Sequence, residues 1–327
     1  MYANKDVLVT GGTGLIGRPL VELLLQAGAN VRVASLDDES RCPAGAEFVR
    51  GNLMHWDFCQ KIAKDIDYVF HLVGIKGSPA MTSKKPASFF VPIISVNTNM
   101  MEAARQAGVK RYLYTSSIGV YSPAEVLYED DVWKTFPSEN DKFAGWAKRM
   151  GELQAEAYKI EYGWDNIAMV RPANVYGPYD NFDPNTAMVI PSLIKRALGG
   201  ENPLIVWGDG SQVRDFIHAR DVARGMLLAL ENITGQPINL GSGVGVTIRR
   251  IVEIIVSNMK IKPEVVWDTS KPSGDRKRVM DISRARAIGF QPIISIEEGI
   301  KGVMDWYQEN ADIVNKRYNV FTEKRLG

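Results

Sequence analysis

The chain has 327 residues, 45% of them apolar and 24% charged, enough to build one large domain or two ordinary ones. Lysine and arginine total 39 against 38 acidic residues, so its net charge gives no reason to expect nucleic acid or a membrane surface as partner. An apolar run starts as early as Val7, which leaves no room for a signal peptide. No run approaches the roughly 20 apolar residues that span a bilayer. We therefore expect a cytoplasmic protein.

Cysteine and histidine are sparse. The two cysteines are Cys42 and Cys59, and three histidines are scattered along the chain. Two thiols without metal-ligand spacing are typical of a protein from a reducing compartment. We expect no metal site.

Short β-branched runs alternate with helical patterns through the first half of the chain. They lie at 7–10, 31–35, 47–51, 68–74, 112–117 and 167–172. The first intervening helix, about Leu15 to Ala27, has Pro19 in its first turn and Gly28 just after its end, as helices commonly do. Strands separated by helices predict an α/β fold with a doubly wound parallel sheet.

The pattern loosens from about Tyr176. Turn-forming residues cluster at 177–185, and short apolar runs follow at 204–208, 237–241 and 263–267, which predicts a smaller α/β lobe. The helical stretch at 219–232 is expected to return to the first lobe. We therefore predict one domain from 1–175 plus about 213–242, and a second from 176–212 plus about 243–327.

A glycine-rich turn follows the first strand directly. Its sequence, GGTGLIG, places Gly11, Gly14 and Gly17 at G-x-x-G-x-x-G spacing, with a helix beginning inside the motif. Such a turn lets the backbone approach a pyrophosphate while helix N–H groups point at its charge. The motif predicts a Rossmann-type dinucleotide site in which Leu15 and Ile16 also contact the cofactor.

The ends of the next strands are expected to complete this site. Ser35 ends the second strand and Asp37 follows. A carboxylate there usually binds the adenosine ribose and would repel a 2′-phosphate, which favours NAD over NADP, although Asp37 and Asp38 could also be solvated turn residues. After the third and fourth strands, we expect Asn52 and Leu53 to face the adenine and Leu72, Val73 and Gly74 to line the dinucleotide.

Four motifs occur in order along the chain: GGTGLIG at 11–17, TSSIGVY at 115–121, RPANVYGP at 171–178 and RDFIH at 214–218. Together they resemble the extended short-chain dehydrogenase/reductase family, the NAD(P)-dependent epimerases, dehydratases and reductases of nucleotide sugars. The resemblance implies redox chemistry at a sugar carbon, usually C4. It also implies a dinucleotide contact at Pro172, and a homodimer formed by the helices around residues 95–107 and 143–160.

In that family a tyrosine moves the proton and a serine hydrogen-bonds the reacting oxygen. A lysine holds the nicotinamide ribose and lowers the pKa of the tyrosine through its positive charge. Ser117 matches the serine and Lys148 the lysine, although an ordinary strand-end hydroxyl and a solvated helix lysine are alternatives. Four residues before Lys148, on the same helical face, the tyrosine position holds Ala144. Three interpretations stay open: an engineered Tyr-to-Ala change, a natural enzyme using Tyr121, Ser117 or a water, or a protein that only binds.

By the same resemblance, Asn174 would bind the substrate near its diphosphate, from a loop after a strand, and Arg214 would clamp that diphosphate. Turn geometry for Asn174, and an ion pair of Arg214 with Asp215 or Asp221, are the alternatives. The run Arg276-Lys277-Arg278 offers a further phosphate contact through Arg276 and Arg278, or is a solvated charge run.

The stretches 181–184, 189–194 and 268–272 resemble the GDP-sugar epimerase/reductase branch, which favours a GDP-linked over a UDP-linked substrate. That branch epimerises two carbons with a cysteine and a histidine. The matching positions here hold Gly119 and Met188; we expect Met188 to contact substrate, and no 3,5-epimerisation. The sequence thus predicts NAD-dependent redox or 4-epimerisation at C4 of a nucleotide sugar. The rival interpretation is a non-catalytic sensor that binds NAD and a sugar nucleotide.

Overall fold

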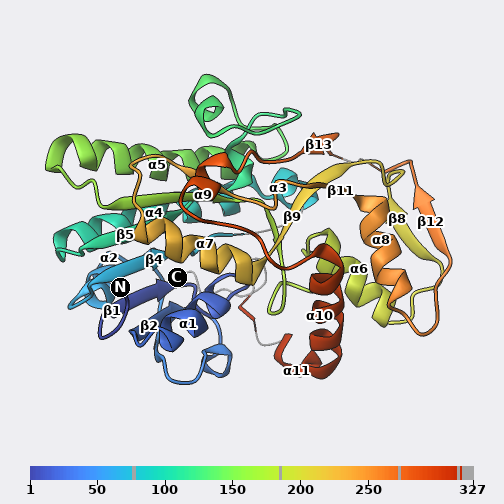
Figure 1. Ribbon diagram of the computed structural model, residues 1–327, viewed down its shortest axis with the longest axis horizontal. Coiled ribbons are helices and arrows are strands. Elements are labelled where there is room, and N and C mark those ends of the chain that lie inside the picture. The colour runs from blue at the N-terminus through green and yellow to red at the C-terminus, as the bar shows by residue number, and fades with distance from the viewer. Residues whose placement is uncertain (76–78, 184–185, 272–273, 315–316, 319–327) are drawn as a thin grey trace.

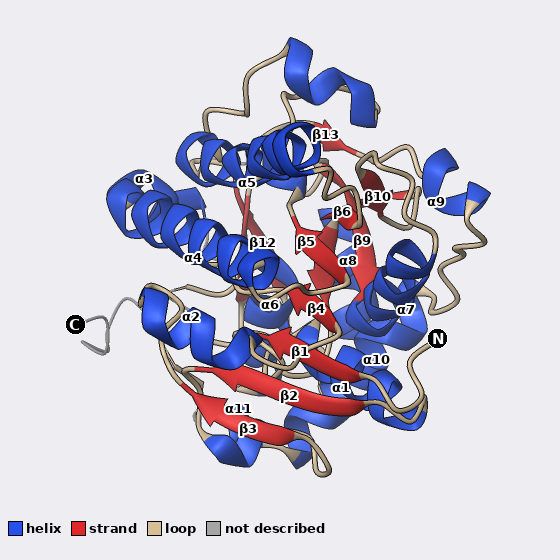
Figure 2. Ribbon diagram, turned by 90° about the vertical axis from the view of Figure 1, so that its left-hand side faces the viewer, coloured by secondary structure: helices blue, strands red, loops and turns tan. Residues whose placement is uncertain are grey.

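A twisted sheet of seven parallel strands forms the centre of the protein, in a computed structural model that describes residues 1–75, 79–183, 186–271, 274–314 and 317–318 (Figures 1 and 2). The strand order is β10-β6-β5-β4-β1-β2-β3. Their bounds are Asp6–Thr10 (β1), Asn30–Ser35 (β2), Glu47–Arg50 (β3), Tyr68–His71 (β4), Arg111–Thr115 (β5), Ile167–Pro172 (β6) and Ile238–Leu240 (β10). The predicted doubly wound α/β fold is confirmed.

Helices cover both faces of this sheet (Figure 2). Successive strand residues point to opposite faces: Val7 and Val9 pack toward α1 (Gly17–Gln26) and α7 (Ala219–Glu231), whereas Leu8 packs toward α2 (Trp56–Ala63), α4 (Pro86–Gln106) and α5 (Lys142–Tyr162). The strand order reverses between β1 and β4. A crevice at the carboxyl ends of the strands is expected at this reversal.

A second group of elements lies beside the carboxyl ends of the strands, on the right of Figure 1. In it, β9 (Val213–His218) pairs with β7 (Asn174–Tyr176), β11 (Gly245–Thr247) and β13 (Lys277–Arg278), and β8 (Leu204–Trp207) pairs with β12 (Val265–Asp268). The helices α6 (Val189–Leu198), α8 (Ile248–Ser257) and α10 (Ile296–Glu309) complete it. Strand β9 serves both cores, because Ile217 packs into the first and Phe216 into the second. Because β9 contributes to both cores, it does not mark a boundary between two domains, and the predicted domain boundaries stay a prediction.

Several short elements complete the structure. They are α3 (Pro79–Lys84), α9 (Ser283–Ala287) and α11 (Ala311–Val314), with the 3-10 turns η1 (Glu39–Arg41), η2 (Ile118–Val120) and η3 (Glu129–Lys134). One expectation needs correction: Asn174 begins strand β7 instead of lying in a loop, because its segment pairs with β9. The run at 237–241 contributes β10 to the large sheet. Pro184 and Pro272, which belong to the stretches that resemble the GDP-sugar branch, lie outside the described residues.

Candidate active site

The glycine turn joins β1 to α1, as predicted. Gly11 has a φ of +74°, which glycine adopts without strain. A Cβ on Gly17 would lie 2.1 Å from the Gly11 carbonyl oxygen, so only glycine lets the helix start so close to the turn. Ile16, the N-cap residue of α1, makes no side-chain capping hydrogen bond. The N–H of Arg18 already donates to the Gly14 carbonyl, so the N–H groups before it are the ones that suit an anion such as a pyrophosphate.

The end of β2 lies beside this turn. The Thr13 hydroxyl is 2.8 Å from the Ser35 hydroxyl and donates to the Asp37 carboxylate at 2.6 Å. The same carboxylate accepts the backbone N–H of Tyr318 at 2.7 Å and lies 3.6 Å from Nε of buried Arg41. Asp37 is thus a buried residue with protein partners, not a solvated turn acid. A ribose hydroxyl would have to share or replace the N–H of Tyr318.

Asn52 follows β3 at the predicted adenine position. Its Oδ1 accepts the N–H of Met54 at 3.0 Å, whereas its Nδ2 is buried without a hydrogen-bond partner among the described residues. A buried donor without a partner costs free energy unless a ligand satisfies it. Asn52 therefore fits a ligand that accepts a hydrogen bond there, while the neighbouring Leu53 is part of the apolar core.

The segment after β4 connects the glycine turn to Lys148. The N–H of Leu72 donates to Thr10, Val73 lies 3.4 Å from the position of a Cβ on Gly11, and Gly74 would place a Cβ 3.6 Å from Nζ of Lys148. Leu15, on the other side of the turn, would lie 3.4 Å from a Cβ on Gly177. The glycine turn, the segment after β4 and Lys148 are thus neighbours at the carboxyl ends of the strands, where this fold places its ligands.

Lys148 is the cation that lies beside Gly74. Its side chain is buried on α5, and Nζ donates to the Thr115 carbonyl at 2.7 Å. Burial lowers the pKa of this ammonium to about 8, and Glu152 opposes the shift. Lys148 is therefore not a solvated helix lysine, as the alternative interpretation had it. Pro172, the predicted dinucleotide contact, is buried at the end of β6, the strand that pairs with β5 and so lies beside Thr115.

Ser117 lies where β5 ends, directly before η2. Its Oγ accepts the N–H of Gly119 at 3.0 Å, which leaves the hydroxyl hydrogen to donate. A Cβ on Gly119 would lie 3.4 Å from this Oγ and 3.5 Å from the carboxyl carbon of Asp141. The structure thus brings an acidic side chain to the predicted reaction centre. Asp141 belongs to none of the sequence motifs; the signal that could have indicated it is its place three residues before Ala144, at the N-cap of α5.

Ala144 lies in an apolar cluster one turn before Lys148. Its methyl group packs with Phe89, Ile93 and Ala147, together with Ile75, Met81, Phe90 and Ile94. A methyl group has no exchangeable proton. Neither this side chain nor its apolar neighbours can perform the proton transfer expected at this position.

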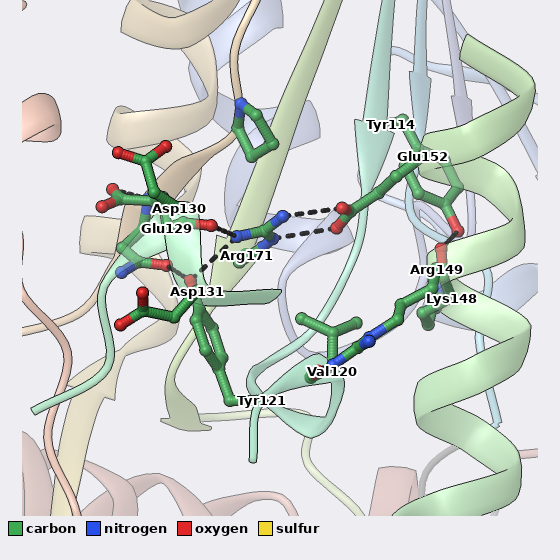
Figure 3. A network of polar contacts seen from close by, with 12 residues as sticks. Tyr114, Val120, Tyr121, Glu129, Asp130, Asp131, Lys148, Arg149, Glu152 and Arg171 are labelled. Carbon is green, nitrogen blue, oxygen red and sulfur yellow. Dashed lines mark hydrogen bonds and ion pairs between the residues drawn. The ribbon is translucent and has the colours of Figure 1, made fainter. Parts of the chain in front are cut away.

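Tyr121, the predicted substitute, belongs to a buried polar network (Figure 3). Its hydroxyl donates to Oδ1 of Asn239 at 2.5 Å and accepts from Arg171 at 3.0 Å. Burial raises the pKa of Tyr121 to about 12. Arg171 in turn makes two hydrogen bonds to Glu152. The Tyr121 hydroxyl therefore both donates and accepts a hydrogen bond within the protein, and it is a poor proton carrier.

The arginines of the predicted diphosphate site differ in their partners, and within the described part of the chain Arg214 lacks the two acidic partners considered for it. Asp215 accepts N–H groups of Ser242 and Gly243, and Asp221 pairs with Arg224. Neither acid makes the alternative ion pair with Arg214 among the described contacts. Arg214 donates to the Val213 carbonyl, and burial lowers the pKa of its guanidinium. A half-buried cation of this kind suits an anionic ligand.

The two other arginines lie around β13. Arg276 is exposed, whereas Arg278 pairs with Asp141 and with Asp275, both at 2.6 Å. Arg278 is therefore held by two carboxylates and is no free phosphate clamp. Nδ2 of Asn174 donates to the Asp215 carbonyl at 2.9 Å, and Met188 caps α6 without a side-chain hydrogen bond.

Comparisons with known proteins agree with this arrangement. The NAD dependent epimerase/dehydratase family model matches residues 7–241. The chain belongs to this family.

Its relatives act on nucleotide sugars, so the predicted functional class is confirmed at the family level. GDP-L-fucose synthase 1 of Arabidopsis thaliana is 30% identical over 94% of each chain. A UDP-glucose 4-epimerase of Thermotoga maritima, solved with UDP-glucose, is 28% identical, covers 94% of this chain and 99% of its own, and superposes with a TM-score of 0.82. MoeE5, solved with UDP-glucose and NAD, is also 28% identical over 94% and 99% of the two chains, with a TM-score of 0.80.

Proposed function

We propose that the protein oxidises or reduces C4 of a nucleotide-linked hexose with a bound nicotinamide dinucleotide, as a 4-dehydrogenase, a 4-keto reductase or a 4-epimerase. The observation that carries the proposal is the buried Lys148, whose Nζ lies 3.6 Å from the position of a Cβ on Gly74 and donates to the Thr115 carbonyl, two residues before Ser117. When bound, the nicotinamide supplies or removes a hydride. Lys148 binds its ribose, and Ser117 donates a hydrogen bond to the sugar oxygen.

NAD is the proposed cofactor. Asp37, after the second strand, would repel the 2′-phosphate of NADP. The unsatisfied donor of Asn52 would bind the adenine, and the N-terminus of α1 would bind the pyrophosphate. We expect calorimetry to measure at least tenfold tighter binding of NAD than of NADP.

The proposed substrate is GDP-linked. The chain resembles the GDP-sugar branch at 181–183 and 189–194 and is similar to a plant GDP-L-fucose synthase. Gly119 and Met188 carry no group that could exchange a carbon-bound proton, so 3,5-epimerisation is not part of the proposal. Asn174, Met188 and Arg214 are the proposed substrate contacts. The test incubates the protein with NAD or NADH and a panel of GDP- and UDP-hexoses and their 4-keto forms, with nicotinamide absorbance and product mass as readouts.

The second candidate is a sensor that binds both ligands without turnover. The observation that favours it is Ala144 in its apolar cluster. Binding of NAD and a sugar nucleotide without any change in nicotinamide absorbance, across the whole panel, would support the sensor and contradict the enzyme.

We also propose a cytoplasmic homodimer. Both cysteines are free thiols, as a reducing compartment leaves them, and none of the described helices is long and apolar enough to cross a membrane. Helices α4 and α5 pack together, and their outer surface exposes Val91, Phe143 and Leu153 at 50%, 44% and 44%. Sedimentation of the wild type and of Leu153→Glu tests this interface, because a charge in its centre should favour the monomer.

A further inference from the structure

Asp141 reaches the reaction centre because two glycines let α5 approach η2 closely. A Cβ on Gly145 would lie 2.3 Å from the Gly119 carbonyl oxygen, so no larger residue fits there. Gly119, in turn, leaves open the space beside Ser117 that a side chain would fill. The Asp141 side chain lies at the edge of this space, with Cβ and Cγ 3.4 and 3.5 Å from the position of the missing Cβ.

The Asp141 carboxylate is not used to cap its own helix. It is the residue before α5, yet its side chain makes no capping hydrogen bond. Instead it pairs with Arg278 at 2.6 Å and keeps 28% of its side chain exposed. The ion pair holds the carboxylate beside Arg278, and Asp141 is also close enough to Arg214 to attract its guanidinium. A ligand whose diphosphate meets Arg214 and whose sugar meets Ser117 would therefore pass Asp141.

The other groups near Ser117 are less suited to exchange a proton with the sugar. Ala144 has no such proton, and Tyr121 donates its hydroxyl to buried Asn239. The ammonium of Lys148 is fully buried and donates to the Thr115 carbonyl beside Gly74, which is the position for a ribose contact. Asp141, by contrast, is a carboxylate that is partly exposed and lies 3.4 Å from the position of a Cβ on Gly119, beside Ser117.

We propose that the Asp141 carboxylate is the acid–base group of this enzyme, in place of the tyrosine that position 144 lacks. As the sugar carbon is oxidised, its O–H bond breaks and the proton passes to the carboxylate, while the carbon loses its hydrogen with the electron pair to the nicotinamide and a C=O bond forms. In reduction the carboxylic acid returns the proton to the carbonyl oxygen. This inference rests on the proposed C4 redox function.

The test compares Asp141→Asn with Asp275→Asn. Both variants remove one carboxylate partner of Arg278. Asp275 also accepts from Ser138 and Asn140, whereas the Asp141 side chain lies 3.4 Å from the position of a Cβ on Gly119. Single-turnover rates are measured with the hexose that the wild type turns over. Affinities for that sugar nucleotide, for the bare nucleoside diphosphate and for NAD are measured by calorimetry. A third variant, Asp141→Asn with Ala144→Tyr, supplies a phenol at the family position.

We expect Asp141→Asn to lower the single-turnover rate at least 100-fold. Its affinity for the sugar nucleotide should fall, whereas its affinities for the bare nucleoside diphosphate and for NAD should not change. Adding Ala144→Tyr to this variant should restore part of the rate. Asp275→Asn should stay within fivefold of the wild type. A rate for Asp141→Asn within fivefold of the wild type overturns the inference and leaves the proposed function intact, even if affinity falls. A wild type that binds both ligands without turnover overturns the inference and the proposed function together. Unaltered affinity for the sugar nucleotide in Asp141→Asn shows that this side chain does not face the sugar and also overturns the inference.

Discussion

Arg171 and Glu152 form a two-point ion pair inside the protein, with N–O distances of 2.9 and 2.7 Å and side-chain exposures of 0% and 2% (Figure 3). The pair links β6 to α5, the helix that carries Lys148 and directly follows Asp141. Because Arg171 also donates to the Glu129 carbonyl and to Tyr121, the pair fixes the position of α5 relative to strand β6. The position of the proposed acid–base group thus depends on a contact outside the pocket.

Replacing Glu152 with Gln should destabilise the protein strongly. The change leaves the Arg171 charge buried without its counter-ion, which typically costs about 3–5 kcal/mol of unfolding free energy. Urea unfolding measures the loss. The matched control is Asp305→Asn, which breaks the solvent-exposed pair with Lys301 and should change stability by less than about 1 kcal/mol. Equal effects of the two substitutions would show that the buried pair contributes little.

Gly17→Ala should abolish dinucleotide binding. The new Cβ would meet the Gly11 carbonyl oxygen at 2.1 Å and push α1 away from the turn that holds the pyrophosphate. Calorimetry with NAD should show at least a tenfold loss of affinity. Gly302→Ala in α10 is the control, since nothing lies within 4 Å of its Cβ. That control should keep NAD affinity and gain about 0.5–1 kcal/mol of stability, because alanine favours a helix.

Local motifs could be predicted from the sequence, whereas contacts between distant segments could not. The glycine turn was predictable because the strand, Gly11 to Gly17 and the helix are contiguous. The meeting of Asp141 with Gly119 was not, because it depends on how closely α5 packs on η2. The bond from the N–H of Tyr318 to Asp37 joins residues 281 positions apart. Backbone groups of this kind leave no side-chain signal in a sequence.

Strand β9 shows the same limit for domain boundaries. Phe216 and Ile217 are neighbours in sequence, but they pack into different cores because their side chains point to opposite faces of one strand. A pattern of apolar residues indicates that such a strand is buried on both sides. It does not indicate which sheet the strand joins.

Tyr121→Phe should separate stability from catalysis. The substitution removes the hydroxyl that bonds to Asn239 and Arg171 and leaves these buried groups less satisfied, which should cost about 1–3 kcal/mol. The rate of nicotinamide reduction should stay within about threefold of the wild type, because Tyr121 is not the proposed proton carrier. A rate loss of 100-fold or more at unchanged ligand affinity would instead identify Tyr121 as that carrier.

Lys148→Met should make the ligand-free protein more stable at neutral pH while weakening NAD binding. Burial lowers the pKa of Lys148 from 10.5 to about 8 in the folded state, a difference that corresponds to about 3 kcal/mol of cost for the buried ammonium. Methionine removes this cost but leaves the Thr115 carbonyl without its partner, which returns about 1–2 kcal/mol. A net gain of about 1–2 kcal/mol is therefore expected at pH 7.

The pH dependence gives the sign of this effect. Between about pH 8 and pH 10.5, the unfolded wild-type chain keeps the Lys148 proton that the folded protein has lost. The unfolding free energy of the wild type therefore rises with pH in this window relative to Lys148→Met. Urea unfolding of both proteins at pH 7, 8, 9 and 10 should show the advantage of the variant shrinking above pH 8. Lys301→Met, at an exposed position, should show no such trend, and a pH-independent difference for Lys148→Met would mean that the buried amine does not titrate in this range.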